Sequence, residues 1–519
     1  MLIVACNPSH DGAICALQDG KLLYSLESEK DSFRRHSRLT PMTVLSFLEH
    51  LGDVPDLIAL GGWAKAIPGS SVGAGYSGAT ETVQRVARLL GREVKLFTSS
   101  HERSHIMMAV GMAPPEIQSA PVKAVLVWEG ALGRFYLLDE NSVVTKEVDV
   151  LNQPGSRYQV LFRIADPAFP DEQQVGKAVE AGKLMALAAY GNSADANEEV
   201  VATVDRLLTI PNIMFSPKAA FTDSPVYNAG VEAQVHKTAA ALLTERIFEI
   251  FAAAATEHLP SDIPLCISGG CGLNCDWNAM WRDLGHFSSV FVPPCPNDSG
   301  SALGTAIDAQ AASTGDPAID WDVYTGLEFD WDSEPDPAMW RKRELDLGDL
   351  VDALGRGQVV AWVQGRWEIG PRALGNRSLL AEPFDSRTRD RLNEIKMREH
   401  YRPVAPCCRL EDAERVFDSG FEDPFMLYFR LVRPDQKLGA VTHVDGSARA
   451  QTVTRETNSR QYDLLSAFAD VHGVGVLCNT SLNFKGTGFI NRMSELARYC
   501  ESRGVPEMVV GDAWFSRSG

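Results

Sequence analysis

Three arginines in the segment QGRWEIGPRALGNRSLL, residues 364–380, are the first candidates for chemistry in this sequence. Arg366, Arg372 and Arg377 stand among residues that favour turns. The preceding run VVAWV is apolar and β-prone, which predicts a buried strand. Glycines after a strand let backbone N–H groups approach an anion, and each arginine adds a planar fork of donors. The segment therefore predicts a site for a phosphate or a carboxylate.

More cations follow in the segment IKMREHYRP, namely Lys396, Arg398 and Arg402. A solvated basic helix face is the alternative interpretation of such a run. The chain as a whole carries a net charge of −19, so a local concentration of positive charge runs against its trend. We therefore favour an anion site.

A second candidate is the pair His101 and His105 in the segment SSHERSH. Residues four apart share one face of a helix, and Ser99 or Ser100 is a plausible N-cap. The spacing suits a metal with imidazole ligands, although two histidines on an ordinary polar helix face remain the alternative. Asp298 precedes another expected helix, where it is either an N-cap or a metal ligand. The local pattern alone favours the cap.

A repeated pattern of strands organises the first part of the chain. Residues 1–27 read as strand, acidic-glycine turn, strand, hairpin and strand, with Asp11-Gly12 in the turn. The pattern returns over residues 124–148 with Glu129-Gly130 in the turn. Such a repeat indicates a duplicated α/β domain. Turns from two facing halves commonly converge on a phosphate or a metal.

Between and after these units, the hydrophobic pattern predicts further helices and strands. We expect helices over residues 40–52, 82–90, 180–191, 238–257 and 348–356. A strand over 264–268 ends in the glycine-rich segment GGCGLN, and a later strand ends in Asn479-Thr480-Ser481, which suits phosphate or nucleotide contacts. A polar stretch that contains several prolines and glycines, residues 313–345, separates two domains. We expect the first over residues 1–315, a linker over 316–345, and the second over 346–519.

Composition narrows the classes of function. The 519 residues are 45% hydrophobic, which is ordinary for a globular protein. A pI near 5.1 argues against a nucleic-acid partner. No apolar run approaches the roughly 18 residues needed to span a membrane. No signal peptide is visible, and the ten cysteines lack the spacing of disulfides, so we expect a cytoplasmic protein. The sequence allows a homodimer.

The chain resembles the O-carbamoyltransferase family of nodulation-factor, tobramycin and cephamycin biosynthesis. The segments that carry the resemblance span nearly the whole chain: SHDGAI, HERSH, EAGKLMALAAYG, SGGCGLN, PPCPNDSGSALG, GRWEIGPRALGNRS, IKMREHYRPVAP, VTHVDGSARAQTV and NTSLNFKG. The resemblance implies an α/β protein. Its N-terminal domain would have the duplicated actin-like fold of threonylcarbamoyl transferases, and its C-terminal domain would be YrdC-like. It also implies that carbamoyl phosphate and ATP form a carbamoyl-adenylate in the C-terminal domain. The N-terminal domain would then transfer the carbamoyl group to a hydroxyl.

The resemblance implies roles for individual residues. A divalent metal (iron, manganese or magnesium) would be bound by His101, His105 and Asp298, with Glu129 where the family usually has aspartate. Contacts to the adenylate would come from Asp11, Arg38, Gly270 and Asn274. Contacts to carbamoyl phosphate and the nucleotide would come from Arg372, Lys396, Arg402, His443, Arg449, Asn479 and Ser481.

Two further expectations concern the reaction. The acceptor hydroxyl needs a general base, and His10 beside the first acidic turn is our candidate. The variants MLIVACNPSHDGAI and VWEG resemble the cephem branch of the family, which implies a small hydroxylated acceptor, the 3-hydroxymethyl group of a cephem. Another natural-product hydroxyl is the alternative. Three other functions compete with this interpretation: a kinase-like ATPase, a tRNA-modifying transferase, and a non-catalytic nucleotide- or metal-binding protein.

Overall fold

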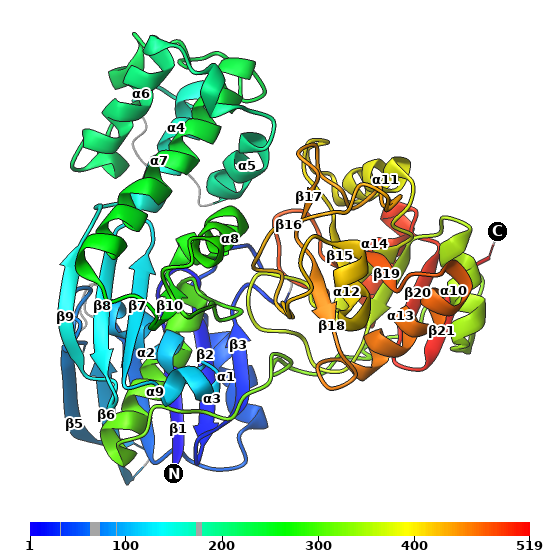
Figure 1. Ribbon diagram of the computed structural model, residues 1–519. Coiled ribbons are helices and arrows are strands. Elements are labelled where there is room, and N and C mark those ends of the chain that lie inside the picture. The colour runs from blue at the N-terminus through cyan, green and yellow to red at the C-terminus, as the bar shows by residue number, and fades with distance from the viewer. Residues whose placement is uncertain (32, 63–72, 90, 173–178, 519) are drawn as a thin grey trace.

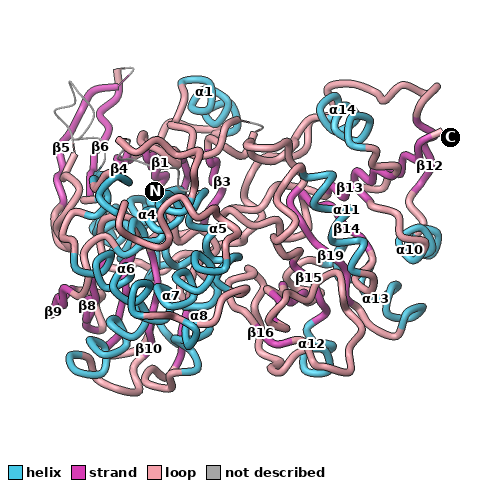
Figure 2. Tube along the Cα trace, turned by 90° about the horizontal axis from the view of Figure 1, so that it is seen from above, coloured by secondary structure: helices cyan, strands magenta, loops and turns pink. Residues whose placement is uncertain are grey.

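A computed structural model describes residues 1–31, 33–62, 73–89, 91–172 and 179–518. Figure 1 shows two sheets and their helices in the N-terminal part, and a separate sheet with its own helices in the C-terminal part. Viewed at right angles in Figure 2, the two parts again lie beside each other. Among the described residues, no helix has the length and apolar character needed to cross a membrane.

The first sheet has the strand order β3-β2-β1-β4-β6-β5. Its strands are β1 (Leu2–Asn7), β2 (Ala13–Gln18), β3 (Lys21–Glu27), β4 (Leu57–Gly61), β5 (Thr82–Leu89) and β6 (Arg92–Ser99). The first three strands are antiparallel, whereas β4 runs parallel to β1, and β6 runs parallel to β4. The three strands expected over residues 1–27 are confirmed.

The second sheet repeats the arrangement of β3-β2-β1-β4-β6 in the order β9-β8-β7-β10-β11. Its strands are β7 (Val122–Trp128), β8 (Gly133–Asp139), β9 (Val144–Asp149), β10 (Pro264–Ser268) and β11 (Ser289–Phe291). Here too three antiparallel strands are followed by two parallel ones. Two sheets with one strand order and one set of directions confirm the duplicated actin-like domain.

Two helices pack against each other between the halves: α2 (His101–Gly111) and α9 (Ser301–Thr314). Helix α2 contacts β7 and β10 of the second sheet, and α9 contacts β1 and β4 of the first. Their close approach depends on Gly304, because an added Cβ there would lie 1.8 Å from Ser104 O. Arg103 also bonds Asp308 bidentately (2.7 and 2.8 Å). Each sheet therefore packs against a helix that follows the other sheet in the chain.

The remaining helices of this part are α1 (Pro41–His50), α3 (Pro115–Gln118), α4 (Pro154–Ala165), α5 (Val179–Ala188), α6 (Glu198–Thr209), α7 (Gln234–His258) and α8 (Cys275–Asp283). Helices α4 to α7 gather beyond one end of the sheets (Figure 1). The helix expected over residues 82–90 is wrong. Residues 82–89 form β5, which pairs with β6 along its whole length, and Leu90 lies outside the described residues. The valines at 83 and 86 suggested a helical period, but both are exposed on this edge strand.

The C-terminal part is built on a mixed sheet in the order β12-β21-β20-β13-β14-β19-β15-β18. The strands are β12 (Trp340–Glu344), β13 (Val360–Val363), β14 (Arg377–Ala381), β15 (Ala405–Arg409), β18 (Gln451–Val453), β19 (Val476–Ser481), β20 (Glu507–Val510) and β21 (Ala513–Arg517), with a separate pair β16 (Arg430–Leu431) and β17 (Ser447–Ala448). The helices are α10 (Leu347–Gly355), α11 (Ser386–Lys396), α12 (Leu410–Val416), α13 (Ser459–His472) and α14 (Met493–Arg503). This α/β architecture agrees with the expected YrdC-like domain. Strand β12 lies within the expected linker and pairs with β21.

The arginine-rich loop that follows β13 is bound to the N-terminal part. Arg366 donates to the carbonyl of Leu23 in β3 at 2.7 Å, and to those of Thr325 and Gly326 in the expected linker at 2.8 and 2.6 Å. Glu27 accepts from Gly370 N at 2.5 Å, and the buried Lys30 donates to Gly370 O. The two parts of the molecule therefore meet at this loop.

Gly488 marks a second close contact between the two parts, since an added Cβ would lie 1.6 Å from Glu29 O. We expect Gly488→Ala to lower the free energy of unfolding by about 1–3 kcal/mol, because backbone must move to relieve the overlap. Gly52→Ala, where no atom lies within 4 Å of the added Cβ, should change it by less than about 0.5 kcal/mol. Urea unfolding measures both. Equal midpoints for the two variants would contradict the contact.

Candidate active site

The histidine pair lies in the first two turns of α2, and its spacing puts both side chains on one face of the helix. Ser100 is the N-cap and accepts from Arg103 N. His101 and His105 are 1% and 0% exposed, and their rings pack edge to face at 4.6 Å. His105 Nδ1 lies 2.9 Å from Ser268 Oγ at the end of β10. This contact orients the ring so that Nε2 faces the cluster described next.

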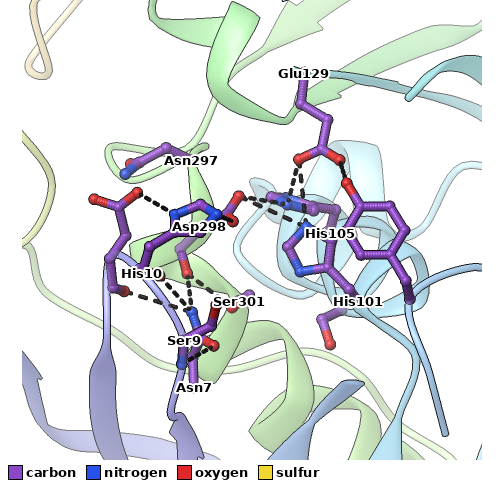
Figure 3. A network of polar contacts seen from close by, with 12 residues as sticks. Asn7, Ser9, His10, His101, His105, Glu129, Asn297, Asp298 and Ser301 are labelled. Carbon is purple, nitrogen blue, oxygen red and sulfur yellow. Dashed lines mark hydrogen bonds and ion pairs between the residues drawn. The ribbon is translucent and has the colours of Figure 1, made fainter. Parts of the chain in front are cut away.

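Two carboxylates meet the histidines from the second half of the domain (Figure 3). Glu129 follows β7, and Asp298 begins the short helix before α9. Glu129 Oε2 lies 3.3 and 3.4 Å from Nε2 of His101 and His105, and Asp298 Oδ1 lies 3.6 and 3.4 Å from the same atoms. One ligand atom from each of the four buried residues lies within 4.8 Å of the others. Two imidazoles and two carboxylates in this arrangement fit a divalent transition metal.

Charge couples the members of this cluster. Burial disfavours the charged imidazole of His105, but Asp298 and Glu129 outweigh burial and raise its pKa to about 9. Burial likewise opposes ionisation of Glu129, yet the two histidines hold its pKa well below the usual value. The Glu129 carboxylate therefore stays ionised and attracts positive charge into a buried space, whether a proton or a metal ion.

Asp298 is not a helix cap, contrary to the interpretation that the local sequence favours. The N-cap of α9 is Gly300, without a side-chain bond, and Asn297 precedes the short helix Asp298–Gly300. The Asp298 carboxylate instead faces His101, His105 and His10. Local sequence could not reveal this, because α2 lies almost two hundred residues earlier in the chain.

Tyr76 supports the cluster and was not predicted. Its hydroxyl donates to Glu129 Oε1, and its ring stacks on His101 at 4.7 Å and 26°. Glu129 thus presents its other oxygen to the histidines. No motif surrounds Tyr76 in the sequence, so only the fold brings it here. The bond gives the Glu129 carboxylate a fixed position beside the histidines.

The first acidic turn lies beside the cluster. His10 Nδ1 lies 3.0 Å from Asp11 Oδ2, and His10 Nε2 lies 3.2 Å from Asp298 Oδ2. His36 Nδ1 approaches the other oxygen of Asp11 at 2.7 Å. The bond to Asp11 raises the pKa of His10 to about 9. Asp11 itself adopts a positive φ of 52°, which orients its carboxylate between two histidines.

The other predicted N-terminal contacts are spread around the same region. Gly270 begins the short helix after β10, and no atom lies within 4 Å of the position of a Cβ on it. Asn274 is the N-cap of α8 and accepts from the backbone of Asp276 and Trp277. Arg38 is exposed. The free space beside Gly270 is compatible with a bound ligand, whereas the side-chain oxygen of Asn274 already accepts the hydrogen bonds that cap α8.

A cation cluster occupies the C-terminal side of the interface. Lys396 is buried and donates to Ser481 Oγ (3.2 Å) and to Asn483 Oδ1. Arg372 donates to Leu273 O of the N-terminal part at 2.9 Å. Burial, followed by repulsion from neighbouring arginines, lowers the pKa of Lys396 and brings those of Arg372 and Arg398 to about 9. These like charges are positioned for an anion.

A pocket between the two parts adjoins this cluster. It is lined by the predicted residues Arg402, His443 and Arg449 and by α5. His443 Nε2 lies 3.3 Å from Ala186 O of that helix. Among the described atoms, Nε of Arg372 and Nε of Arg449 are buried without a hydrogen-bond partner. Such donors are expected at a site that receives an anion.

Two of the arginines in the opening segment do not belong to the cluster. Arg366 binds the carbonyls named above, and the buried Arg377 donates to Gln364 O, Gly365 O and Asn376 O. Asn479 likewise bonds Ala373 O and Gln451 Oε1. Arg377 and Asn479 hold the loop in shape, and Arg366 joins it to Leu23 of the N-terminal part. Arg372 is the arginine of this segment that lies in the cation cluster.

Comparison with known proteins agrees with this architecture. Residues 82–307 match the family described as Carbamoyltransferase N-terminus, and residues 351–517 match Carbamoyltransferase C-terminus. The chain belongs to the carbamoyltransferase family. It is 60% identical to a 3'-hydroxymethylcephem-O-carbamoyltransferase of Amycolatopsis lactamdurans (100% of both chains) and 60% identical to one of Streptomyces clavuligerus (100% of this chain, 99% of the relative).

More distant relatives include a nodulation protein U of Rhizobium tropici, which is 32% identical over 96% of this chain and 93% of its own. The (R)-2-hydroxyglutaryl-CoA dehydratase component A of Acidaminococcus fermentans aligns with 60% of this chain and 99% of its own at 14% identity and a TM-score of 0.31, which is too low to inform on function. The two matching family domains and the relatives that are 60% identical show that the protein is an enzyme of the carbamoyltransferase class.

We expect Tyr76→Phe to weaken metal binding by about ten-fold, because removing a partner that orients a metal ligand typically costs 10–100-fold. Glu129→Asp should weaken it too, and adding Tyr76→Phe to that variant should change little, since the shorter carboxylate no longer reaches the hydroxyl. Chelator competition with Mn²⁺ gives the affinities. Independent, additive effects of the two substitutions would contradict the role of Tyr76.

Proposed function

We propose that this enzyme uses ATP to activate carbamoyl phosphate as carbamoyl-adenylate and then transfers the carbamoyl group to a hydroxyl. The observation that carries the proposal is the meeting of two different polar clusters at one interface, a cation cluster and a histidine–carboxylate cluster. An activating step and a transferring step need these two environments. We propose the same division of the chain, with residues 1–315 for transfer, 316–345 as a linker, and 346–519 for activation.

The cation cluster suits the activating step. Carbamoyl phosphate and the ATP phosphates bring several negative charges together, and their mutual repulsion must be balanced. We propose that Arg372, Lys396, Arg402 and Arg449 do this. His443, Asn479 and Ser481 then shape the site: Ser481 bonds Lys396, Asn479 holds the arginine-rich loop, and His443 joins the pocket to α5.

The histidine–carboxylate cluster suits the transferring step. We propose that His101, His105, Glu129 and Asp298 bind the metal, with iron or manganese a better match than magnesium because imidazole ligands suit the transition metals. When bound, the metal would polarise the carbonyl or hold the phosphate of the adenylate. Asp11, Arg38, Gly270 and Asn274 would line the path by which the adenylate reaches this cluster.

His10 is our proposed general base for the acceptor hydroxyl. A base must be unprotonated, and the raised pKa of His10 comes from its bond to Asp11 and the nearby carboxylates. A cation held by Asp298 and Glu129 would neutralise part of that negative charge and lower the pKa of His10. Asp11 would keep the ring oriented, since it bonds Nδ1 and leaves Nε2 facing the cluster.

We propose the 3-hydroxymethyl group of a cephem as the acceptor. The support is the printed activity of two relatives that are 60% identical over their full lengths. A cytoplasmic location and a homodimer stay predictions.

Incubation with ATP, carbamoyl phosphate and a 3-hydroxymethylcephem should yield a product heavier by one carbamoyl group, with AMP and pyrophosphate as by-products. Both donors should be required. Mass spectrometry and nucleotide chromatography check this result. Formation of ADP and phosphate alone would rule out the adenylate and favour a kinase-like ATPase. Carbamoylation of an aminoglycoside but not of the cephem would place the acceptor in another branch.

The two steps should separate by variant. Arg372→Ala or Lys396→Ala should slow carbamoyl-phosphate-dependent exchange of labelled pyrophosphate into ATP by about 10–100-fold, the value of one charge-assisted contact of roughly 1.5–3 kcal/mol. His101→Ala combined with His105→Ala should lose bound metal and carbamoyl transfer but keep the exchange. Arg341→Ala, an exposed arginine on β12, is the control. Loss of exchange in the histidine variant would contradict separate sites.

A further inference from the structure

A short strap, residues 33–36, extends from the N-terminal part onto the C-terminal domain. Its backbone bonds the turn that follows β19. Arg35 N donates to Gly486 O at 3.1 Å, and Gly488 N donates to Phe33 O at 2.9 Å. Arg34 forms an antiparallel bridge with Thr487 between these bonds. The strap is therefore fixed to the other domain by main-chain pairing.

The strap lies between the two polar clusters. At one end, His36 bonds Asp11 beside the histidine–carboxylate cluster. At the other, the turn that receives the strap begins with Ser481 and Asn483, the two residues that bind Lys396 Nζ. Arg35 is thus placed next to the cation cluster although it belongs to the N-terminal part.

The positive charge of Arg35 acts on the cations of that cluster. After burial, which is the main cause, repulsion from Arg35 contributes to the lowered pKa values of Lys396, Arg372 and Arg402. Arg35 is an exposed residue, so a ligand can reach it from solvent. Like charges held at such proximity are stabilised when a multiply charged anion binds among them.

We propose that Arg35 binds a phosphate group of the substrates at the cation cluster, so that the N-terminal part completes the activating site of the C-terminal domain. This inference rests on the proposed function. Carbamoyl phosphate and ATP both carry phosphates, and the planar fork of arginine suits either one. Because His36 follows directly in the chain, the strap also ties the orientation of Asp11 to the position of this phosphate contact.

The test compares Arg35→Ala with Arg34→Ala, its exposed neighbour on the strap, in the full-length enzyme. Pyrophosphate exchange is measured with carbamoyl phosphate varied at saturating ATP, and then with ATP varied. Arg35→Ala should raise the KM for one of the two substrates, the one whose phosphate Arg35 binds, by about 10–100-fold. Arg35→Lys should recover part of the loss, and Arg34→Ala should stay within about two-fold of the unaltered enzyme. Equal behaviour of Arg35→Ala and Arg34→Ala in both arms would overturn the proposal.

Calorimetric titration with inorganic pyrophosphate separates this inference from the proposed function, because it needs no turnover. Arg35→Ala should bind pyrophosphate about ten-fold or more weakly than Arg34→Ala. If the unaltered enzyme shows no exchange but Arg35→Ala still loses this affinity, the adenylate mechanism fails and the anion contact stands. If both variants bind pyrophosphate equally, the contact of Arg35 is wrong whatever the exchange assay shows.

Discussion

The docking of the arginine-rich loop onto the N-terminal part is the interaction on which the other features of the site depend. Arg366 alone satisfies three backbone carbonyls, and Gly370 is bonded on both sides by Glu27 and Lys30. Buried charged groups are costly when a partner is lost, so these contacts fix the loop firmly. As a consequence, Arg372, which lies two residues after Gly370, reaches Leu273 O in the glycine-rich segment of the N-terminal part.

Both polar clusters hold charge that the protein does not fully balance. On one side, repulsion among arginines adds to burial and brings the pKa of Arg372 to about 9. On the other, Asp298 and Glu129 outweigh burial and raise the pKa of His105 to about 9. Each cluster is arranged before its ligand arrives, and a ligand of opposite charge removes the repulsion within it. Such preorganisation is what makes electrostatic stabilisation effective in catalysis.

The sequence predicted the elements correctly wherever the pattern that indicates them lies within a few neighbouring residues. The repeated strand unit, the helix capped by Ser100 and the strand 264–268 follow from patterns within a few residues, and the structure confirms them. It was insufficient where partners are distant. The exposed edge strand β5 imitated a helix, and Asp298 resembled a cap because α2 is remote in sequence. Tyr76 and Arg35 have no motif around them, so only the packing of two halves and two domains places them at the clusters.

The most direct test of two separate, adjacent sites is a crystal structure of the enzyme with Mn²⁺ and carbamoyl phosphate, using anomalous scattering to find the metal. We expect one anomalous peak bounded by His101, His105, Glu129 and Asp298, and a separate phosphate density among Arg372, Lys396, Arg402 and Arg449. A metal peak elsewhere, or a phosphate bound only at the histidine cluster, would contradict this expectation.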